Sequence, residues 1–138
     1  MQAYWLLKTE PGEYAWEDML KDRKVTWDGI RAPAALKNLA QMQSGDMVFI
    51  YHTGVERAVQ GIARVEGSPY PDPDQSDPRF LVVDLVPAAS LLRPVTLKRI
   101  KESGLFPNWE LVRQPRLSVV PVSQEQWQQV LEWVRESN

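Results

Sequence analysis

The stretch Ser44-Gly45-Asp46-Met47-Val48-Phe49-Ile50-Tyr51-His52-Thr53 decides how the chain is organised. Ser-Gly-Asp is typical of a turn, because glycine accepts positive φ and aspartate hydrogen-bonds to nearby backbone. The unbroken apolar run that follows has the length and composition of a strand covered on both faces. We therefore predict a central strand whose end brings Tyr51, His52 and Thr53 to the lining of a pocket. The alternative is a core strand that simply meets solvent at a polar end.

The segment Ala3–Thr9 is predicted to form another strand. Its side chains alternate between two faces, and the following Glu10-Pro11-Gly12-Glu13 breaks the pattern. Trp5 is interpreted as a core residue. Lys8 and Thr9 differ from it, because they are polar groups at the end of a buried strand, and they are candidates for a binding site.

The rest of the pattern predicts a single α+β domain over residues 1–138. Helices are expected at 14–24, 33–42, 96–103 and from 123 onward, with Thr96 and Ser123 as N-caps and Gln126 completing a capping box. Extended segments are expected at 25–27, 58–65, 80–86 and 117–122. The proline-rich segment 67–78 is expected to be a stiff surface loop, and 87–94 to bend away.

Composition limits the possible functions. The chain has 138 residues, 43% of them apolar and 25% charged, which is typical of one globular domain. No apolar run is long enough to span a membrane, and we expect no signal peptide. The absence of cysteine and the single histidine favour a reducing, cytoplasmic setting with no metal site and no cofactor. The net charge of −2 means that nucleic-acid binding would need a local basic patch.

Two cationic segments are candidates for such a patch. Trp27-Asp28-Gly29-Ile30-Arg31 precedes Pro33, which suits the first turn of a helix, so Arg31 is expected beside free N–H groups that attract anions. Arg113 and Arg116 flank a proline-stiffened turn. They are either phosphate contacts or simply an exposed pair.

The catalytic motifs that we considered are missing. There is no Gly-x-Ser-x-Gly elbow for a hydrolase and no phosphate-binding loop, so we do not expect an enzyme. Aromatic and cationic residues instead favour a pocket in which Trp27 and Tyr51 hold a base that is hydrogen-bonded by His52, Thr53 or backbone. Lys8, Arg31, Arg113 and Arg116 would then place phosphate. The alternative is a small-molecule or protein-interaction domain that binds an anionic ligand without nucleic acid.

Several blocks occur in an order that resembles the EVE domain family. They are Tyr4-Trp5-Leu6-Leu7-Lys8-Thr9-Glu10-Pro11, Trp27-Asp28-Gly29-Ile30-Arg31, Gly45-Asp46 through Tyr51-His52-Thr53, Gly61-Ile62-Ala63, Tyr70-Pro71-Asp72 and Arg116-Leu117-Ser118-Val119. The resemblance spans nearly the whole chain. It implies a PUA-like fold: a small mixed β-barrel of about five to six strands with peripheral helices, related to the YTH readers of RNA.

The same resemblance implies a non-catalytic reader of a modified base, with modified cytosine in DNA or a modified base in RNA as ligand. We expect a monomer that binds no membrane. Matched by position, the pocket residues are Lys8, Thr9, Trp27, Gly29, Ile30, Arg31, Tyr51, His52, Arg116 and Ser118. Arg31, Arg113 and Arg116 are expected to meet phosphates. One departure is Ala32-Pro33-Ala34, where many relatives carry Asn and an aromatic residue. Polar contacts from that helix start would be lost, which leaves the identity of the ligand open.

Overall fold

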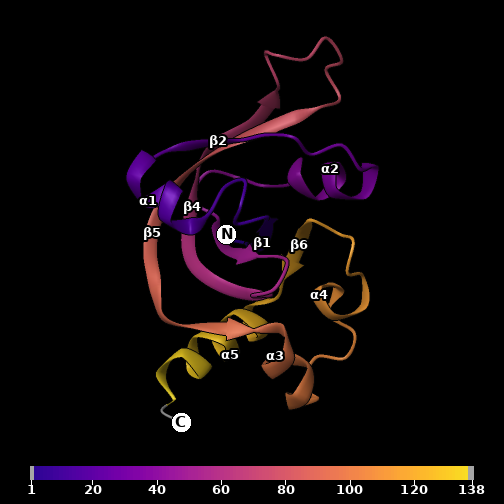
Figure 1. Cartoon of the computed structure of the whole chain (residues 1–138). Coiled ribbons are helices and arrows are strands. Elements are labelled where there is room, and N and C mark those ends of the chain that lie inside the picture. Colours follow the sequence, from indigo (N-terminus) through magenta and orange to yellow (C-terminus); the bar gives the residue numbers. More distant parts are fainter. Residues whose placement is uncertain (1, 137–138) are drawn as a thin grey trace.

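A six-stranded mixed sheet forms the centre of the protein. The computed structural model describes residues 2–136, and its strand order is β2-β5-β4-β3-β1-β6 (Figure 1). The strands are β1 (Tyr4–Thr9), β2 (Val25–Trp27), β3 (Met47–His52), β4 (Ala58–Pro71), β5 (Leu81–Thr96) and β6 (Val119–Val122). Within residues 2–136, β1 and β3 are the only pair that runs in parallel. The predicted central strand is confirmed, because β3 lies between β1 and β4 and is buried from Val48 to His52.

The sheet is open, whereas a closed barrel was expected. Its outer strands are β2 and β6, and no ladder joins them within the described residues. β6 pairs only with β1, and Pro121 within it has no N–H to offer a further strand. The mixed α+β class with helices around the sheet is confirmed.

β4 and β5 are much longer than the sequence predicted. They pair from Ala58 and Thr96 as far as Pro71 and Leu81, with three register shifts. The predicted surface loop therefore shrinks to the segment after Pro71, and residues 87–94 stay in the sheet instead of bending away. Figure 1 shows β5 running along one side of the molecule and then turning across its lower end.

In the described part of the chain, five helices surround the sheet. They are α1 (Trp16–Asp22), α2 (Pro33–Leu39), α3 (Leu97–Ser103), α4 (Glu110–Arg113) and α5 (Gln124–Arg135). Two predicted caps are confirmed: the Thr96 hydroxyl accepts the Arg99 N–H at 3.1 Å, and Ser123 forms a capping box with Gln126. The sequence pattern did not predict α4, which is a single short turn. No helix in the described part of the chain is long and apolar enough to cross a membrane.

Aromatic side chains attach the helices to the sheet. The Trp127 ring of α5 stacks between two rings of the sheet, at 3.8 Å from Phe49 and 4.6 Å from Tyr4 between centroids. The Trp16 ring of α1 lies directly over Gly61 of β4. These contacts bury the Trp16 and Trp127 rings and hold α1 and α5 against the sheet.

Candidate functional site

A cavity of about 470 Å³ lies where the end of β1 meets β2 and the segment that leads into α1. We call it the β1–β2 cavity. Its lining residues are Lys8, Thr9, Glu10, Glu13, Tyr14, Val25, Thr26, Trp27, Asp28, Gly29, Ile30 and Ser118. This volume falls within the range of small-molecule binding sites in proteins.

Two aromatic rings form part of its wall. The rings of Tyr14 and Trp27 meet edge to face, with centroids 6.1 Å apart and an angle of 82°. Trp27 is only 6% exposed, so its ring is held in the core and presents a limited part of its surface to the cavity. The Tyr14 hydroxyl donates to Asp22 at 2.9 Å, and burial together with Asp22 raises the pKa of Tyr14. Tyr14 is therefore a neutral ring with a fixed orientation.

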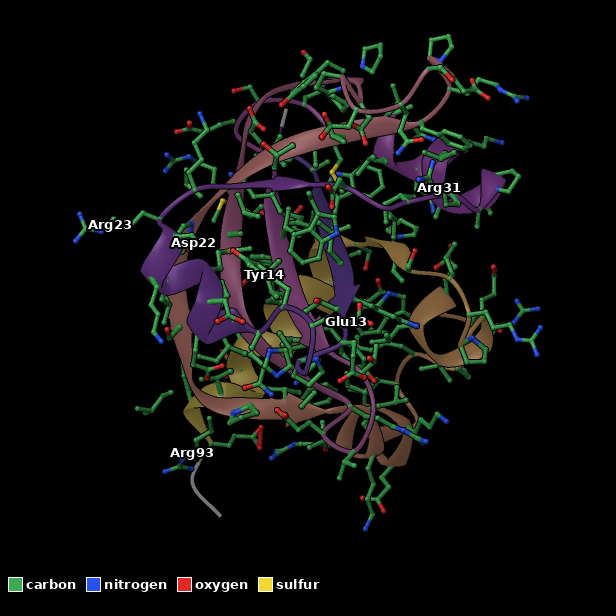
Figure 2. All side chains as sticks on the ribbon, turned by 45° about the horizontal axis from the view of Figure 1, so that its top comes forward. Glu13, Tyr14, Asp22, Arg23, Arg31 and Arg93 are labelled. Carbon is green, nitrogen blue, oxygen red and sulfur yellow. The ribbon has the colours of Figure 1, made fainter. Side chains whose placement is uncertain are left out.

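The segment between β1 and α1 folds back over the end of β1. Backbone N–H groups of Glu13 and Tyr14 both donate to the Glu10 carbonyl at 2.9 Å, and the Thr9 hydroxyl donates to the Tyr14 carbonyl at 2.6 Å. Figure 2 shows Glu13 and Tyr14 next to each other on this segment. Glu13 and Asp28 are exposed, and neither carboxylate pairs with a cation among the described residues. They are hydrogen-bond acceptors at the mouth of the cavity.

Lys8 supplies the cation of this cavity. Its ammonium donates to the Pro115 carbonyl at 2.9 Å and lies 5.8 Å from the centroid of the Tyr51 ring. Burial lowers the pKa of Lys8, because no carboxylate compensates for the lost water. Lys8 also lines a second cavity of about 290 Å³, which reaches α3 and α4 and which we call the α3–α4 cavity.

His52 has a structural role in this protein and is not placed to bind a ligand. Its side chain is 2% exposed, its Nε2 accepts the Trp16 N–H at 2.9 Å, and its Nδ1 lies 2.9 Å from Glu56 Oε1. Because Nε2 accepts, the proton resides on Nδ1 and is donated to Glu56. Both ring nitrogens are thus used within the fold, contrary to the predicted hydrogen bond to a base.

Tyr51 and Thr53 also lie outside the β1–β2 cavity. Both line the α3–α4 cavity instead. The ends of β1 and β3 lie side by side, with Lys8 opposite Tyr51 and Thr9 opposite His52. Of the described residues, Lys8 is the one that lines both cavities. The predicted pocket is therefore divided into two neighbouring hollows.

The three predicted phosphate-binding arginines do not share one cavity. The Arg31 guanidinium lies 4.4 Å from the centroid of the Phe80 ring, in a groove between α2 and residues 78–81. Figure 2 shows Arg31 beside α2, apart from Glu13 and Tyr14. Arg116 shares a shallow hollow with Ala32 and Ala34 at the start of α2, and Arg113 is exposed at the end of α4. None of the three lines the β1–β2 cavity.

The structure thus brings together six of the predicted pocket residues, namely Lys8, Thr9, Trp27, Gly29, Ile30 and Ser118. Sequence reasoning missed Glu13, Tyr14 and Asp28. Tyr14 was assigned to the first turn of a helix, but α1 begins only at Trp16. The Pro11-Gly12 break before Tyr14 is the signal that indicates a folded-back segment at this point.

The fold and the cavity define a small α+β domain with an aromatic, polar site beside the central parallel strand pair. The EVE domain model matches residues 3–133, and the chain belongs to the EVE domain family. A protein from Rhodopseudomonas palustris, solved by NMR, has 32% identity and a TM-score of 0.90, with 98% of this chain and 96% of that one covered.

Two comparisons concern human proteins. The structure of human THYN1 protein in complex with 5-methylcytosine containing DNA has 23% identity and a TM-score of 0.88, covering 99% of this chain and all of that one. In the curated human thymocyte nuclear protein 1, 144 residues align at 26% identity. That alignment covers 86% of this chain, and the chain spans 64% of the length of the human protein.

Proposed function

We propose that this chain is a non-catalytic nucleic-acid-binding module that holds a modified base in the β1–β2 cavity. The observation that carries the proposal is the cavity itself: about 470 Å³, walled by Tyr14 and Trp27 and supplied with polar groups. The complex of human THYN1 with 5-methylcytosine containing DNA supports it. A base enters such a cavity only from a single strand or after flipping out of a duplex.

The charged groups favour a base that carries an amino group. Glu13 and Asp28 are free acceptors, and a carboxylate accepts a hydrogen bond from the exocyclic amine of cytosine. Lys8 lines the β1 side of the cavity, but its ammonium donates to the Pro115 carbonyl beside the α3–α4 cavity, so the carboxylates are the groups that select the base. 5-Methylcytosine therefore fits these groups better than thymine, which has the same methyl group but a carbonyl in place of the amine.

The same carboxylates disfavour the alternative of a small anionic ligand in this cavity, because like charges repel at short range. His52 is the only imidazole in the chain, and its two nitrogens serve Trp16 and Glu56. That arrangement supports binding without catalysis.

The test is a set of matched DNA and RNA strands that differ only at one position: 5-methylcytosine, cytosine or thymine. We expect Trp27→Ala to weaken binding of the 5-methylcytosine strand by roughly tenfold or more, since one base stacked on a ring contributes about 1–3 kcal/mol. Fluorescence anisotropy measures the affinity, and circular dichroism confirms that each variant is folded.

Trp133→Ala is the matched control. Trp133 is as buried as Trp27, at 7% against 6% exposure, but lies on α5 and does not line the β1–β2 cavity. The Trp133→Ala variant should be less stable than the wild type but should bind the 5-methylcytosine strand with the same affinity. Equal affinity for all three strands, or equal losses in the two tryptophan variants, would contradict the proposal.

A further inference from the structure

The α3–α4 cavity gathers cations and no carboxylate. Three of its lining residues are Lys8, Arg57 and Lys101, and none is an aspartate or glutamate. The other lining residues are Tyr51, Thr53, Gly54, Leu97, Leu111, Val112 and Pro115. In a protein with a net charge of −2, this concentration of positive charge is a local exception.

The fold holds the cations in place. Arg57 ends the turn between β3 and β4 with a left-handed φ of 43°, which is sparsely populated for a residue other than glycine. Its guanidinium Nε donates to the Gly54 carbonyl at 3.2 Å, and its own carbonyl accepts the Leu97 N–H at 2.8 Å. Lys101 lies one helical turn beyond Leu97 on α3, so the two side chains lie on the same face of the helix and both line the cavity.

The cations of the α3–α4 cavity have no acidic partner in the part of the chain that the structure describes. Among the described residues, none of the three cations forms an ion pair with a carboxylate. A Cβ at Gly54 would lie 3.4 Å from Glu10 Oε2, but Glu10 accepts the Gly12 N–H and lines the β1–β2 cavity. Glu56 accepts from His52 and Gln60. Burial lowers the pKa of the half-buried Lys8, and a bound anion would offset this desolvation.

We propose that the α3–α4 cavity binds a phosphate group: that of the nucleotide next to the base held in the β1–β2 cavity. This inference rests on the proposed function, because it assigns the neighbouring phosphate of the same ligand. Lys8 lines both cavities, so a base and an adjoining phosphate are within reach of one side chain. Arginine and lysine are the side chains that proteins use for phosphate, and a neutral tyrosine hydroxyl at Tyr51 adds a donor.

Lys101→Gln tests the site, and Lys98→Gln is its control. Both lysines are exposed residues of α3, but only Lys101 lines the cavity, so the two variants lose the same charge from the same helix. We expect Lys101→Gln to weaken binding of a modified-base strand by roughly threefold to tenfold at low salt, and Lys98→Gln by much less. Equal losses in the two variants would show a general charge effect and overturn the site.

Neutral methylphosphonate linkages, placed one at a time around the modified base, locate the phosphate. One methylphosphonate next to that base should weaken binding to the wild-type protein as much as Lys101→Gln weakens binding of the unmodified linkage. The same linkage should cost the Lys101→Gln variant almost nothing further, because the two changes remove one interaction. Additive losses at every linkage would exclude contact between Lys101 and a strand phosphate.

A separate measurement keeps this inference distinct from base reading. Inorganic phosphate and a nucleoside 5′-monophosphate are titrated into the protein while the amide signals of Thr53, Gly54 and Arg57 are followed by NMR. Saturable shifts that disappear in Lys101→Gln but persist in Lys98→Gln support the site even if no modified strand is preferred. Saturation by the monophosphate at the affinity of the strand would identify a free nucleotide as the source of the phosphate. No shift with either probe would overturn the site.

Discussion

At the scale of single residues, the contact between Trp16, His52 and Gly61 positions the start of α1. The Trp16 N–H donates to His52, and its indole N–H donates to the Ser90 hydroxyl at 2.8 Å. The ring lies so close to β4 that a Cβ at Gly61 would collide with it. Because α1 follows directly on the segment that carries Tyr14, this contact also fixes one wall of the β1–β2 cavity.

Gly61→Ala should therefore destabilise the fold by about 1–3 kcal/mol, the usual cost of forcing extra volume into a packed core. The indole cannot move away cheaply, because Trp16 is 3% exposed, the indole N–H donates to Ser90, and the backbone N–H of the same residue donates to His52. Urea unfolding monitored by fluorescence measures the change. Gly12→Ala is the control, since a Cβ there meets only the flexible Glu10 carboxylate, at 3.3 Å.

The double variant with Trp16→Leu separates collision from backbone effects. A smaller side chain leaves room for the methyl group, so Gly61→Ala should cost clearly less in that background. An unchanged cost would mean that the glycine serves the backbone of β4 and not the tryptophan.

At the scale of elements, the long β4–β5 pair explains which parts of the fold the sequence could predict. Local signals were sufficient where the interaction is local, as at the Thr96 cap and the capping box of Ser123 and Gln126. Prolines misled the interpretation of β5, because Pro87 and Pro94 are ordinarily strand breakers. They are tolerated here because β2 pairs with β5 only from Val83 to Leu85. Beyond these residues, no described strand pairs with the outer edge of β5.

The site was predictable only in part for a related reason. Polar residues at the end of a buried strand and the Trp27–Ile30 turn are visible in sequence, and both reach the β1–β2 cavity. Which neighbours share a cavity depends on side-chain direction and register, which the composition of a strand does not reveal. Tyr51 and Thr53 consequently face the α3–α4 cavity while His52 between them is buried.

The loop between β4 and β5 allows a prediction about pH. The Arg79 guanidinium donates to Asp77 at 2.7 Å, and this hydrogen bond, with that of the Arg79 backbone N–H, lowers the pKa of Asp77 to about 2. Because the pKa of Asp77 is lower in the folded loop than its ordinary value of 3.8, the ionised carboxylate stabilises the fold at pH values above 3.8. This contribution is lost as the pH falls through about 2. NMR titration of Asp77 should show that midpoint.

Arg79→Gln should raise the Asp77 midpoint toward 3.8, but not fully, because the backbone N–H of residue 79 still donates. The binding affinity should stay unchanged, since Arg79 does not line the β1–β2 cavity. A midpoint that is the same in both proteins would mean that the pair seen here does not form in solution.

At the scale of the whole molecule, charge is distributed unevenly. The chain has 18 acidic and 16 basic residues, yet the α3–α4 cavity continues through Pro115 into the hollow that Arg116 lines. Arg113 stands in the same turn, at the end of α4. Among the described residues, neither arginine pairs with a carboxylate. A strand that places a phosphate in the α3–α4 cavity would pass this basic band next.

Salt dependence tests this path. Each phosphate neutralised on a single strand contributes about 0.7 to the slope of log affinity against log salt. Replacing Arg113 and Arg116 by glutamine should therefore flatten the slope by roughly 1.4 if both meet phosphates. The control is Lys24→Gln with Arg64→Gln, which removes the same charge from a hollow elsewhere, where both residues pair with Glu66. The control should keep the full slope. If both double variants flatten it equally, the overall charge of the protein governs association, and the band along residues 113–116 has no phosphate contacts of its own.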